Sequence, residues 1–275
     1  MLPALEEPYP LPEGSREAFA RDGFVVLREL AAPDEVAAFR GAIAATADRL
    51  RWDMRPLEER DTYGKAFLQT MNLWRHDDTV KRFVFARRFA RVAAELLGVR
   101  GVRLYHDQAL FKEAHGGFTP WHQDQHYWPL DTDRTITLWM PLHDLTPEMG
   151  IMHFARGSHA RGCVVDLPIG DQSEALVSRL VEDAGYETAG AASLRAGDAS
   201  FHAGWTLHGA PPNRTAGVRQ VMTVIYFADG ARAVEPDSPG RKFDLKIWLP
   251  GVAPGELAAS HLNPVLYSAE PDRLD

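Results

Sequence analysis

The stretch that decides the fold is TPWHQDQHYWPLD, residues 119–131, which holds two histidines, two aspartates and two tryptophans. Tryptophan favours burial, whereas histidine and aspartate resist it unless they are paired or bound. On a β-strand, residues two apart project to the same face, so His122 and Asp124 point together while Gln123 points away. An imidazole and a carboxylate on one face provide two ligands for a metal. The sequence therefore predicts a buried metal site on a strand.

A third ligand has to come from another strand, and GWTLHGAPPN (204–213) offers His208. Two histidines and one carboxylate with the opposite positions open form the facial triad of non-haem Fe(II) oxygenases. Eleven residues after His208, Arg219 opens a strand whose odd-numbered residues share its face. A lone arginine on such a face is unfavourable unless it meets an anion, and its planar guanidinium suits a carboxylate. The pattern thus predicts an anion site near the metal.

The segments around these motifs indicate a mostly β fold with flanking helices. After Gly98, runs such as VRLYHDQALFKE (102–113) and VRQVMTVIYFADG (218–230) alternate with Gly, Pro and Asn. This texture is typical of antiparallel sandwiches and barrels. We expect one domain over residues 1–275. It would comprise a helical region at about 15–98, packed on a β-sandwich core at about 99–230, and an extension at 231–275.

Composition excludes several classes of protein. The 275 residues carry a formal net charge of −8, whereas a surface that tracks nucleic acid needs a basic excess. No apolar run approaches about 18 residues and no signal-peptide pattern is visible, so no membrane span is expected. One cysteine, Cys163, excludes an internal disulfide and suits a reducing cytosol; we expect it to be buried in a strand. These features predict a cytoplasmic protein and leave its oligomeric state open.

Taken together, the motifs resemble the phytanoyl-CoA dioxygenase family of Fe(II)- and 2-oxoglutarate-dependent oxygenases. The resemblance rests on the His-x-Asp pair, on LHGAPPN (207–213) and on the arginine that follows. It extends to DGFVVLRELAAPDEVAAFR (22–40) and ARGSHARG (155–162), and so covers roughly residues 15–250. It implies a double-stranded β-helix of the jelly-roll or cupin-like type, with Fe(II), 2-oxoglutarate and dioxygen as cofactor and co-substrates.

The resemblance also assigns residues to roles. The iron ligands of the family map onto His122, Asp124 and His208, and the arginine that binds the distal carboxylate of 2-oxoglutarate maps onto Arg219. One departure concerns Ala210, because some members carry Ser or Thr at this position to support the arginine. Another residue must then support Arg219 in this chain.

Further co-substrate contacts are expected on two strands. Family members place a polar residue and a lysine on the strand before His-x-Asp, and here Gln108 and Lys112 share one face. Lys112 resembles a residue that touches 2-oxoglutarate, and Gln108 suits either co-substrate or substrate. In RTITLWMPL (134–142), Thr135, Thr137 and Trp139 are expected to form a pocket wall, with the alternating residues in the core.

The function implied is hydroxylation of a small-molecule metabolite or natural-product intermediate, coupled to conversion of 2-oxoglutarate into succinate and CO₂. A metal-dependent hydrolase on the same triad is an alternative, because a three-ligand open site also suits zinc, but hydrolysis needs no carboxylate anchor such as Arg219. A non-catalytic small-molecule-binding barrel is another alternative, although it needs no metal triad. Halogenation is disfavoured, because Asp124 takes the position that a halide would need. The substrate stays open.

Overall fold

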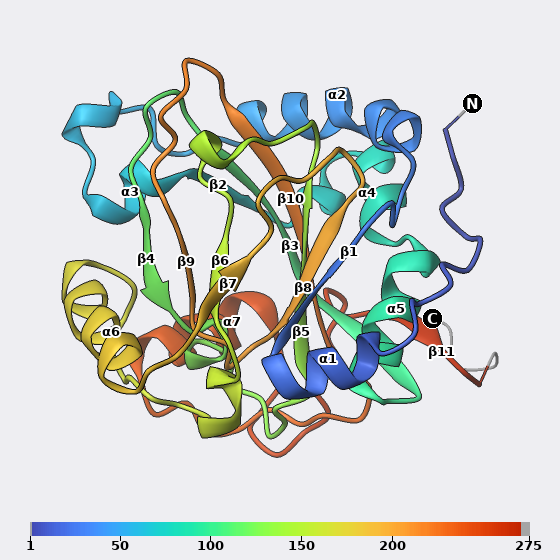
Figure 1. Cartoon of the computed structure of the whole chain (residues 1–275). Coiled ribbons are helices and arrows are strands. Elements are labelled where there is room, and N and C mark those ends of the chain that lie inside the picture. Colours follow the sequence, from blue (N-terminus) through green and yellow to red (C-terminus); the bar gives the residue numbers. More distant parts are fainter. Residues whose placement is uncertain (1, 271–275) are drawn as a thin grey trace.

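The computed structural model describes residues 2–270, and its strands form two sheets (Figure 1). Within these residues the larger sheet has the order β1-β8-β5-β10-β3-β11, with β2 also paired to β3. The smaller sheet has the order β4-β9-β6-β7, and the pairings in both sheets are antiparallel. The strands are β1 (Phe24–Leu27), β2 (Leu68–Met71), β3 (Gly101–Lys112), β4 (Thr119–His122), β5 (Thr135–Pro141), β6 (His153–Ala155), β7 (Thr188–Gly190), β8 (Ala199–Ala203), β9 (His208–Ala210), β10 (Arg219–Ala228) and β11 (Val265–Ser268).

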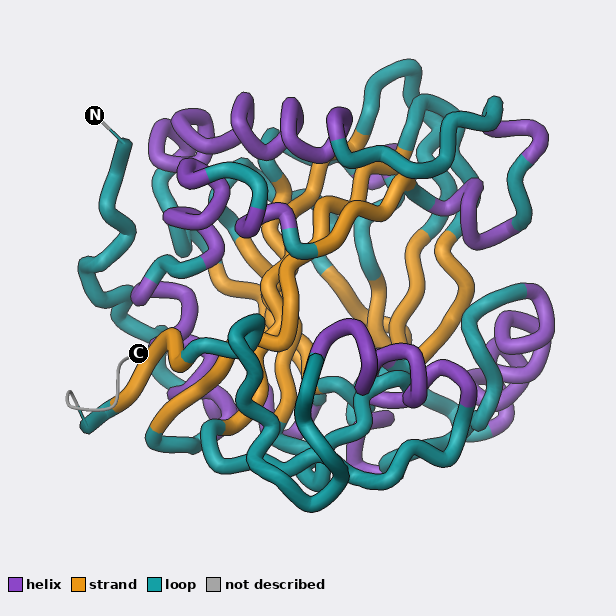
Figure 2. The backbone as a smooth tube through the Cα atoms, turned by 180° about the vertical axis from the view of Figure 1, so that it is seen from behind, coloured by secondary structure: helices purple, strands orange, loops and turns teal. Residues whose placement is uncertain are grey.

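Helices cover the side of the larger sheet that faces away from the smaller one (Figures 1 and 2). The region at 15–98 is mainly helical as predicted, but β1 and β2 also lie in it and join the larger sheet. The helices are α1 (Ser15–Asp22), α2 (Pro33–Arg49), α3 (Thr62–Ala66), α4 (Asp78–Val84), α5 (Arg87–Leu97), α6 (Asp171–Asp183) and α7 (Pro239–Trp248).

The alternation of side chains along β5 gives the larger sheet two different faces. Ile136, Leu138 and Met140 lie in the main core, where α2 and α5 pack on the sheet. Thr137 and Trp139 point to the opposite face, toward a cavity. Successive residues of a strand project to opposite sides, so one seven-residue strand serves both the core and the cavity. The prediction for this strand is confirmed for these residues.

Some expectations about the fold need correction or stay open. Cys163 is exposed, because the chain after Gly162 runs as a loop and forms no strand there. The extension at 231–275 contains α7 and β11, and β11 pairs with β3; residues 271–275 lie outside the described part. Closure of the two sheets into a double-stranded β-helix stays a prediction. In residues 2–270, no helix combines the length and apolar character needed to cross a bilayer.

Candidate active site

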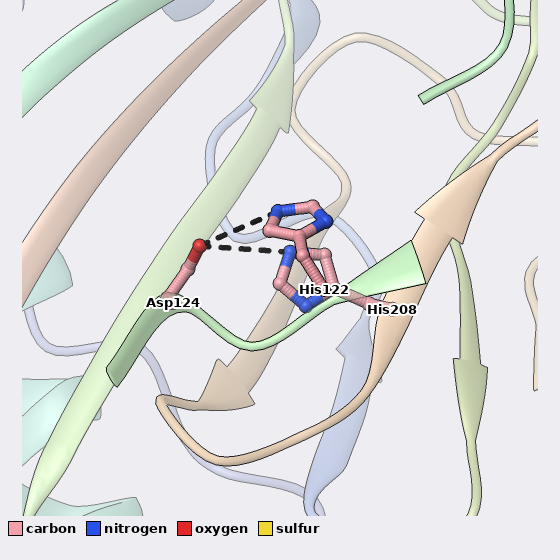
Figure 3. Close-up of side chains that lie close together, drawn as sticks. All are labelled: His122, Asp124 and His208. Atoms are coloured by element: carbon pink, nitrogen blue, oxygen red, sulfur yellow. Dashed lines mark ion pairs between the residues drawn. The ribbon is translucent and has the colours of Figure 1, made fainter. Parts of the chain in front are cut away.

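Two histidines lie side by side at the ends of neighbouring strands. His122 is the last residue of β4 and His208 is the first residue of β9; the two are register partners with ring centroids 4.1 Å apart. Asp124 lies beyond the end of β4, in the 3₁₀ turn Asp124–His126, so the prediction that it shares a strand with His122 is wrong. Its carboxylate nevertheless faces both imidazoles (Figure 3).

Neighbouring backbone and side-chain groups stabilise the turn that carries Asp124. Gln125 N donates to Gly204 O at 2.9 Å. A Cβ on Gly204 would lie 2.3 Å from Thr135 Oγ1, so only glycine permits this close approach. Thr135, which was expected on the pocket wall, does not line the cavity and instead donates to Gln125 Oε1. Thr135 therefore supports the turn.

The donor atoms of His122, Asp124 and His208 all lie within 4.8 Å of one another. The two Nε2 atoms lie 3.6 and 3.7 Å from Asp124 Oδ1. Each Nδ1 faces a backbone carbonyl, Pro120 O at 2.8 Å for His122 and Thr206 O at 2.9 Å for His208. An Nδ1–H that donates to a carbonyl leaves the Nε2 lone pair for a metal. The donor set fits a divalent metal with three protein ligands and open positions.

The protonation states of the triad also suit a metal. Burial favours the neutral acid, but the attraction between the carboxylate and the neighbouring imidazoles of His208, His202 and His122, together with the hydrogen bond from His202, holds the pKa of Asp124 well below its usual value. Asp124 Oδ2 accepts hydrogen bonds from Thr137 Oγ1 at 3.0 Å and from His202 Nε2 at 3.2 Å. Burial lowers the pKa of both His122 and His208. A carboxylate beside two neutral imidazoles is the state that binds metal.

Arg219 places a guanidinium in the cavity wall with only 2% of the residue exposed. Its Nη1 donates to Gly150 O at 2.5 Å, and its guanidinium carbon lies 5.3 Å from the centroid of the Trp139 ring. These contacts support Arg219, since Ala210 offers no hydroxyl. In the described part of the chain its Nε has no partner, and burial lowers the pKa of Arg219 to about 9. A buried guanidinium with an unused donor points to an anion site.

Lys112 is the register partner of Arg219 on the neighbouring strand. It is fully buried, and its Nζ donates to Gly117 O and to Thr119 Oγ1, the latter at 3.3 Å. Burial and the nearby charge of Arg219 lower the pKa of Lys112 to about 6. Thr119 lines the cavity and Lys112 does not. The lysine expected to touch 2-oxoglutarate therefore lies behind Thr119.

One cavity of about 340 Å³ brings the predicted residues together. It is lined by the triad and by four other predicted residues, Gln108, Thr137, Trp139 and Arg219. His106 and His202 also line it and were missed as site residues. Strand alternation could have found His106, because it lies two residues before Gln108. The pairing of His202 with Thr137 is visible only in the structure.

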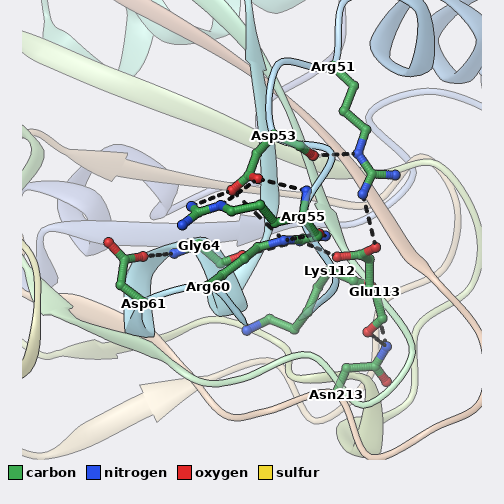
Figure 4. A network of polar contacts seen from close by, with 9 residues as sticks. All are labelled: Arg51, Asp53, Arg55, Arg60, Asp61, Gly64, Lys112, Glu113 and Asn213. Atoms are coloured by element: carbon green, nitrogen blue, oxygen red, sulfur yellow. Dashed lines mark hydrogen bonds and ion pairs between the residues drawn. The ribbon is translucent and has the colours of Figure 1, made fainter. Parts of the chain in front are cut away.

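Other missed wall residues come from helices that carry no motif. They are Tyr63 of α3 and Phe243, Asp244 and Trp248 of α7. The segment that leads into α3 is fastened by charged groups (Figure 4). The side chain of Arg60, almost fully buried, donates to Glu113 Oε2 and to the carbonyl of Arg55. The α3 wall is thus attached to Glu113, directly after β3.

Comparisons with known proteins identify the family of this chain. A family model described as phytanoyl-CoA dioxygenase matches residues 19–221. A probable alpha-ketoglutarate-dependent hypophosphite dioxygenase of Stutzerimonas stutzeri is 26% identical over 195 residues, covering 70% of this chain and 67% of that protein. The non-heme alpha-ketoglutarate-dependent carbocyclase SnoK from nogalamycin biosynthesis superposes with a TM-score of 0.78 at 23% identity, covering 94% of this chain and 99% of that one.

The epimerase SnoN, solved in complex with Fe³⁺, alpha-ketoglutarate and nogalamycin RO, superposes with a TM-score of 0.71 at 25% identity, over 92% of this chain and 98% of that one. The likeness to SnoK shows a shared fold. The range matched by the family model contains the triad and Arg219 and spans most of the chain. The chain therefore belongs to the phytanoyl-CoA dioxygenase family, whose members are iron- and 2-oxoglutarate-dependent oxygenases.

Proposed function

We propose that this protein is an Fe(II)- and 2-oxoglutarate-dependent oxygenase that hydroxylates a small organic molecule. The observation that carries the proposal is one cavity that contains both a metal-binding triad and a buried guanidinium with an unused donor. In the net reaction, one atom of dioxygen enters the substrate and the other enters succinate, which forms from 2-oxoglutarate with loss of CO₂. Hydroxylation of a C–H bond balances this equation without a further reductant.

In this proposal His122, Asp124 and His208 hold the iron. Thr137 and His202 orient the carboxylate of Asp124 by binding its Oδ2, which keeps Oδ1 directed at the two imidazoles. Iron with bound 2-oxoglutarate supplies the oxidising power for dioxygen activation. The chain itself supplies ligand geometry, and supporting hydrogen bonds of this kind are worth about 10–100-fold in metal affinity.

The co-substrate end of the cavity is built around Arg219, which we assign to the distal carboxylate of 2-oxoglutarate. A carboxylate there would satisfy the free Nε and pair with the guanidinium charge. Lys112, which donates to Thr119, would take up a proton when the carboxylate binds and so add positive charge without touching the ligand directly. Trp139 holds the guanidinium plane by ring contact. These roles explain why a buried lysine lies next to a buried arginine in this fold.

We assign residues 1–275 to a single oxygenase domain with a double-stranded β-helix core. Support for the core comes from the two antiparallel sheets and from the fold shared with SnoK. The partner would be a small-molecule substrate, in line with the acidic net charge, which disfavours nucleic acid. A cytoplasmic location, suggested by the single cysteine, completes the assignment.

Other functions of the same cavity would be a different oxidative reaction, hydrolysis, or binding without catalysis. SnoK is named a carbocyclase and SnoN an epimerase, so related machinery also forms rings and inverts centres. A metal-dependent hydrolase would use the same triad, but it has no use for the buried Arg219. A non-catalytic binding barrel would have no use for three converging metal donors.

The test is Fe(II)-dependent formation of succinate from 2-oxoglutarate by the purified protein. We expect slow turnover without substrate, abolished when Zn²⁺ replaces Fe(II) and in Arg219→Leu. Ester and amide hydrolysis by the zinc form, together with no succinate from the iron form, would establish the hydrolase instead. Succinate assays with a panel of small molecules, followed by mass spectrometry of the products, separate a gain of oxygen from ring formation or epimerisation.

A further inference from the structure

We propose that the substrate is an uncharged, ring-containing molecule with a carbonyl or hydroxyl oxygen that accepts a hydrogen bond from Gln108 Nε2. This inference rests on the proposed function, because it places the substrate in the cavity that holds the triad. It also assigns Gln108 to the substrate, not to 2-oxoglutarate. The proposal is based on the charge of the cavity walls, on their shape, and on the hydrogen-bond donor that they leave free.

The positive charge of the cavity is concentrated at one end. Among the described residues that line it, Arg219 is the only lysine or arginine, and 2-oxoglutarate uses its charge. The opposite end contains Asp244, which accepts a hydrogen bond from Tyr105 Oη at 2.9 Å. Burial raises the pKa of Asp244 to about 7, so this end is neutral to negative near pH 7. An anion would therefore be bound there without a counter-charge, at a large desolvation cost.

Aromatic side chains shape the same end of the cavity. Tyr127 lines it beside Gly240, and Phe243 and Trp248 line it from α7. Phe243 is 58% exposed, so its ring is available at the mouth. Flat aromatic faces favour stacking against rings. The walls thus suit a ring system more than a small inorganic ion.

A chain of hydrogen bonds runs along the cavity wall formed by α3, β2 and β3. Tyr63 Oη donates to Gln69 Oε1 at 2.9 Å, and Gln69 Nε2 donates to Gln108 Oε1 at 2.6 Å. Both Gln108 Oε1 and Gln69 Oε1 are therefore occupied as acceptors. Gln108 lines the cavity, and within the described residues its Nε2 donates to no other protein group. A primary amide in this position offers N–H donors, which call for an acceptor oxygen on the substrate.

The volume of the cavity limits how much of the substrate enters. About 340 Å³ lies near the lower end of small-molecule sites, which span roughly 300–1,000 Å³. Because 2-oxoglutarate shares the space, only the reacting ring of the substrate fits beside Gln108. The remainder would lie at the mouth against Phe243. The ring next to Gln108 is then the part brought to the metal.

The experiment uses three probes in equilibrium dialysis against the full chain loaded with Fe(II) and 2-oxoglutarate under nitrogen. The probes are 1-tetralone, a neutral bicyclic ketone; tetralin, the same bicycle without oxygen; and hypophosphite. We expect 1-tetralone to bind three- to tenfold more tightly than tetralin, which is the effect of one hydrogen bond. Hypophosphite should neither bind measurably nor displace 1-tetralone.

Gln108→Glu tests the donor directly. The new carboxylate still accepts from Gln69 but has no N–H to donate, so the preference for 1-tetralone over tetralin should disappear. Gln220→Glu is the matched control: Gln220 lies outside the cavity, where its Oε1 accepts from Arg40, and the preference should persist. Visible charge-transfer absorption of the iron–2-oxoglutarate complex verifies loading of each variant.

The outcomes separate two failures. Absence of the charge-transfer absorption from the unaltered protein would refute the proposed function and this inference with it. Retained absorption with equal affinities for 1-tetralone and tetralin, or with no binding of either, would overturn the inference alone. Tight hypophosphite binding that displaces 1-tetralone would also overturn it, and would indicate an oxyanion substrate.

Discussion

Replacing Arg219 with leucine should make the ligand-free protein more stable while removing its affinity for 2-oxoglutarate. The two effects have opposite signs because the guanidinium is held for a ligand, at a cost to the empty fold. Without ligand it keeps one hydrogen bond, to Gly150 O, and one ring contact, with Trp139. With ligand it gains a carboxylate partner.

The magnitudes follow from the burial of this side chain. Its pKa is lowered from 12.5 to about 9, and at about 1.4 kcal/mol per tenfold change this corresponds to roughly 5 kcal/mol. Loss of the bond to Gly150 and of the contact with Trp139 offsets about 2–4 kcal/mol. A net gain of roughly 1–3 kcal/mol should raise the apo Tm by about 2–6 °C. Removing one partner of a buried charge pair should weaken 2-oxoglutarate binding at least about thirtyfold.

The assay is thermal unfolding by calorimetry, with and without saturating 2-oxoglutarate and metal. The Tm of the unaltered protein should rise when 2-oxoglutarate is added, and the Tm of Arg219→Leu should not change. Arg103→Leu is the matched control on the larger sheet, because Arg103 already pairs with Asp229 and its loss should lower the apo Tm. An apo Tm of Arg219→Leu that falls as far as that of Arg103→Leu would refute the reasoning. So would an unchanged response to 2-oxoglutarate.

Three further predictions concern the metal and the neighbouring lysine. Alanine in place of any one of His122, Asp124 and His208 should lower Fe(II) affinity in metal dialysis by more than the 10–100-fold typical of a supporting residue; full retention by all three variants would contradict the triad. Thr137→Val should weaken Fe(II) binding about 10–100-fold and Thr137→Ser should restore it, whereas equal affinities would deny the role of the hydroxyl. Lys112, whose pKa is lowered to about 6, is mostly neutral at pH 7.5, and a nearby bound carboxylate raises that pKa, so 2-oxoglutarate binding should take up a proton. The uptake should fade below pH 6, where Lys112 is already protonated; titration calorimetry in two buffers of different ionisation enthalpy measures it, and no uptake at pH 7.5 would count against the lysine.

Strand alternation explains much of what the sequence predicted about the site. It placed Thr137 and Trp139 on the cavity face of β5, and Arg219 on the same side of β10, because a period of two holds wherever a strand is regular. It failed at Asp124, since the chain turns after His122 and a two-residue spacing brings the groups together in either geometry. The sequence therefore predicted that His122 and Asp124 lie close together, but from an incorrect backbone.

Strand alternation could not predict how far a side chain lies from the cavity, nor which residues distant in the sequence form its walls. Alternation gives the face on which Lys112 lies, but not that Thr119 comes between it and the cavity. Phe243 and Trp248 lie on a short helix with no motif, and only tertiary packing determines which wall they form. Cys163 shows the limit of local propensity, because a β-rich run of letters there forms an exposed loop.

The position of α7 has a consequence for how such enzymes diversify. The family model ends at residue 221, after the triad and Arg219, whereas α7 begins at Pro239 and contributes Phe243, Asp244 and Trp248 to the cavity. The oxidising machinery and part of the selectivity wall thus occupy separate stretches of the chain. Under the proposed function, we expect exchange of α7 to change which molecule binds while the triad stays intact. We therefore expect α7 to be the segment to exchange when the protein is to bind a different molecule.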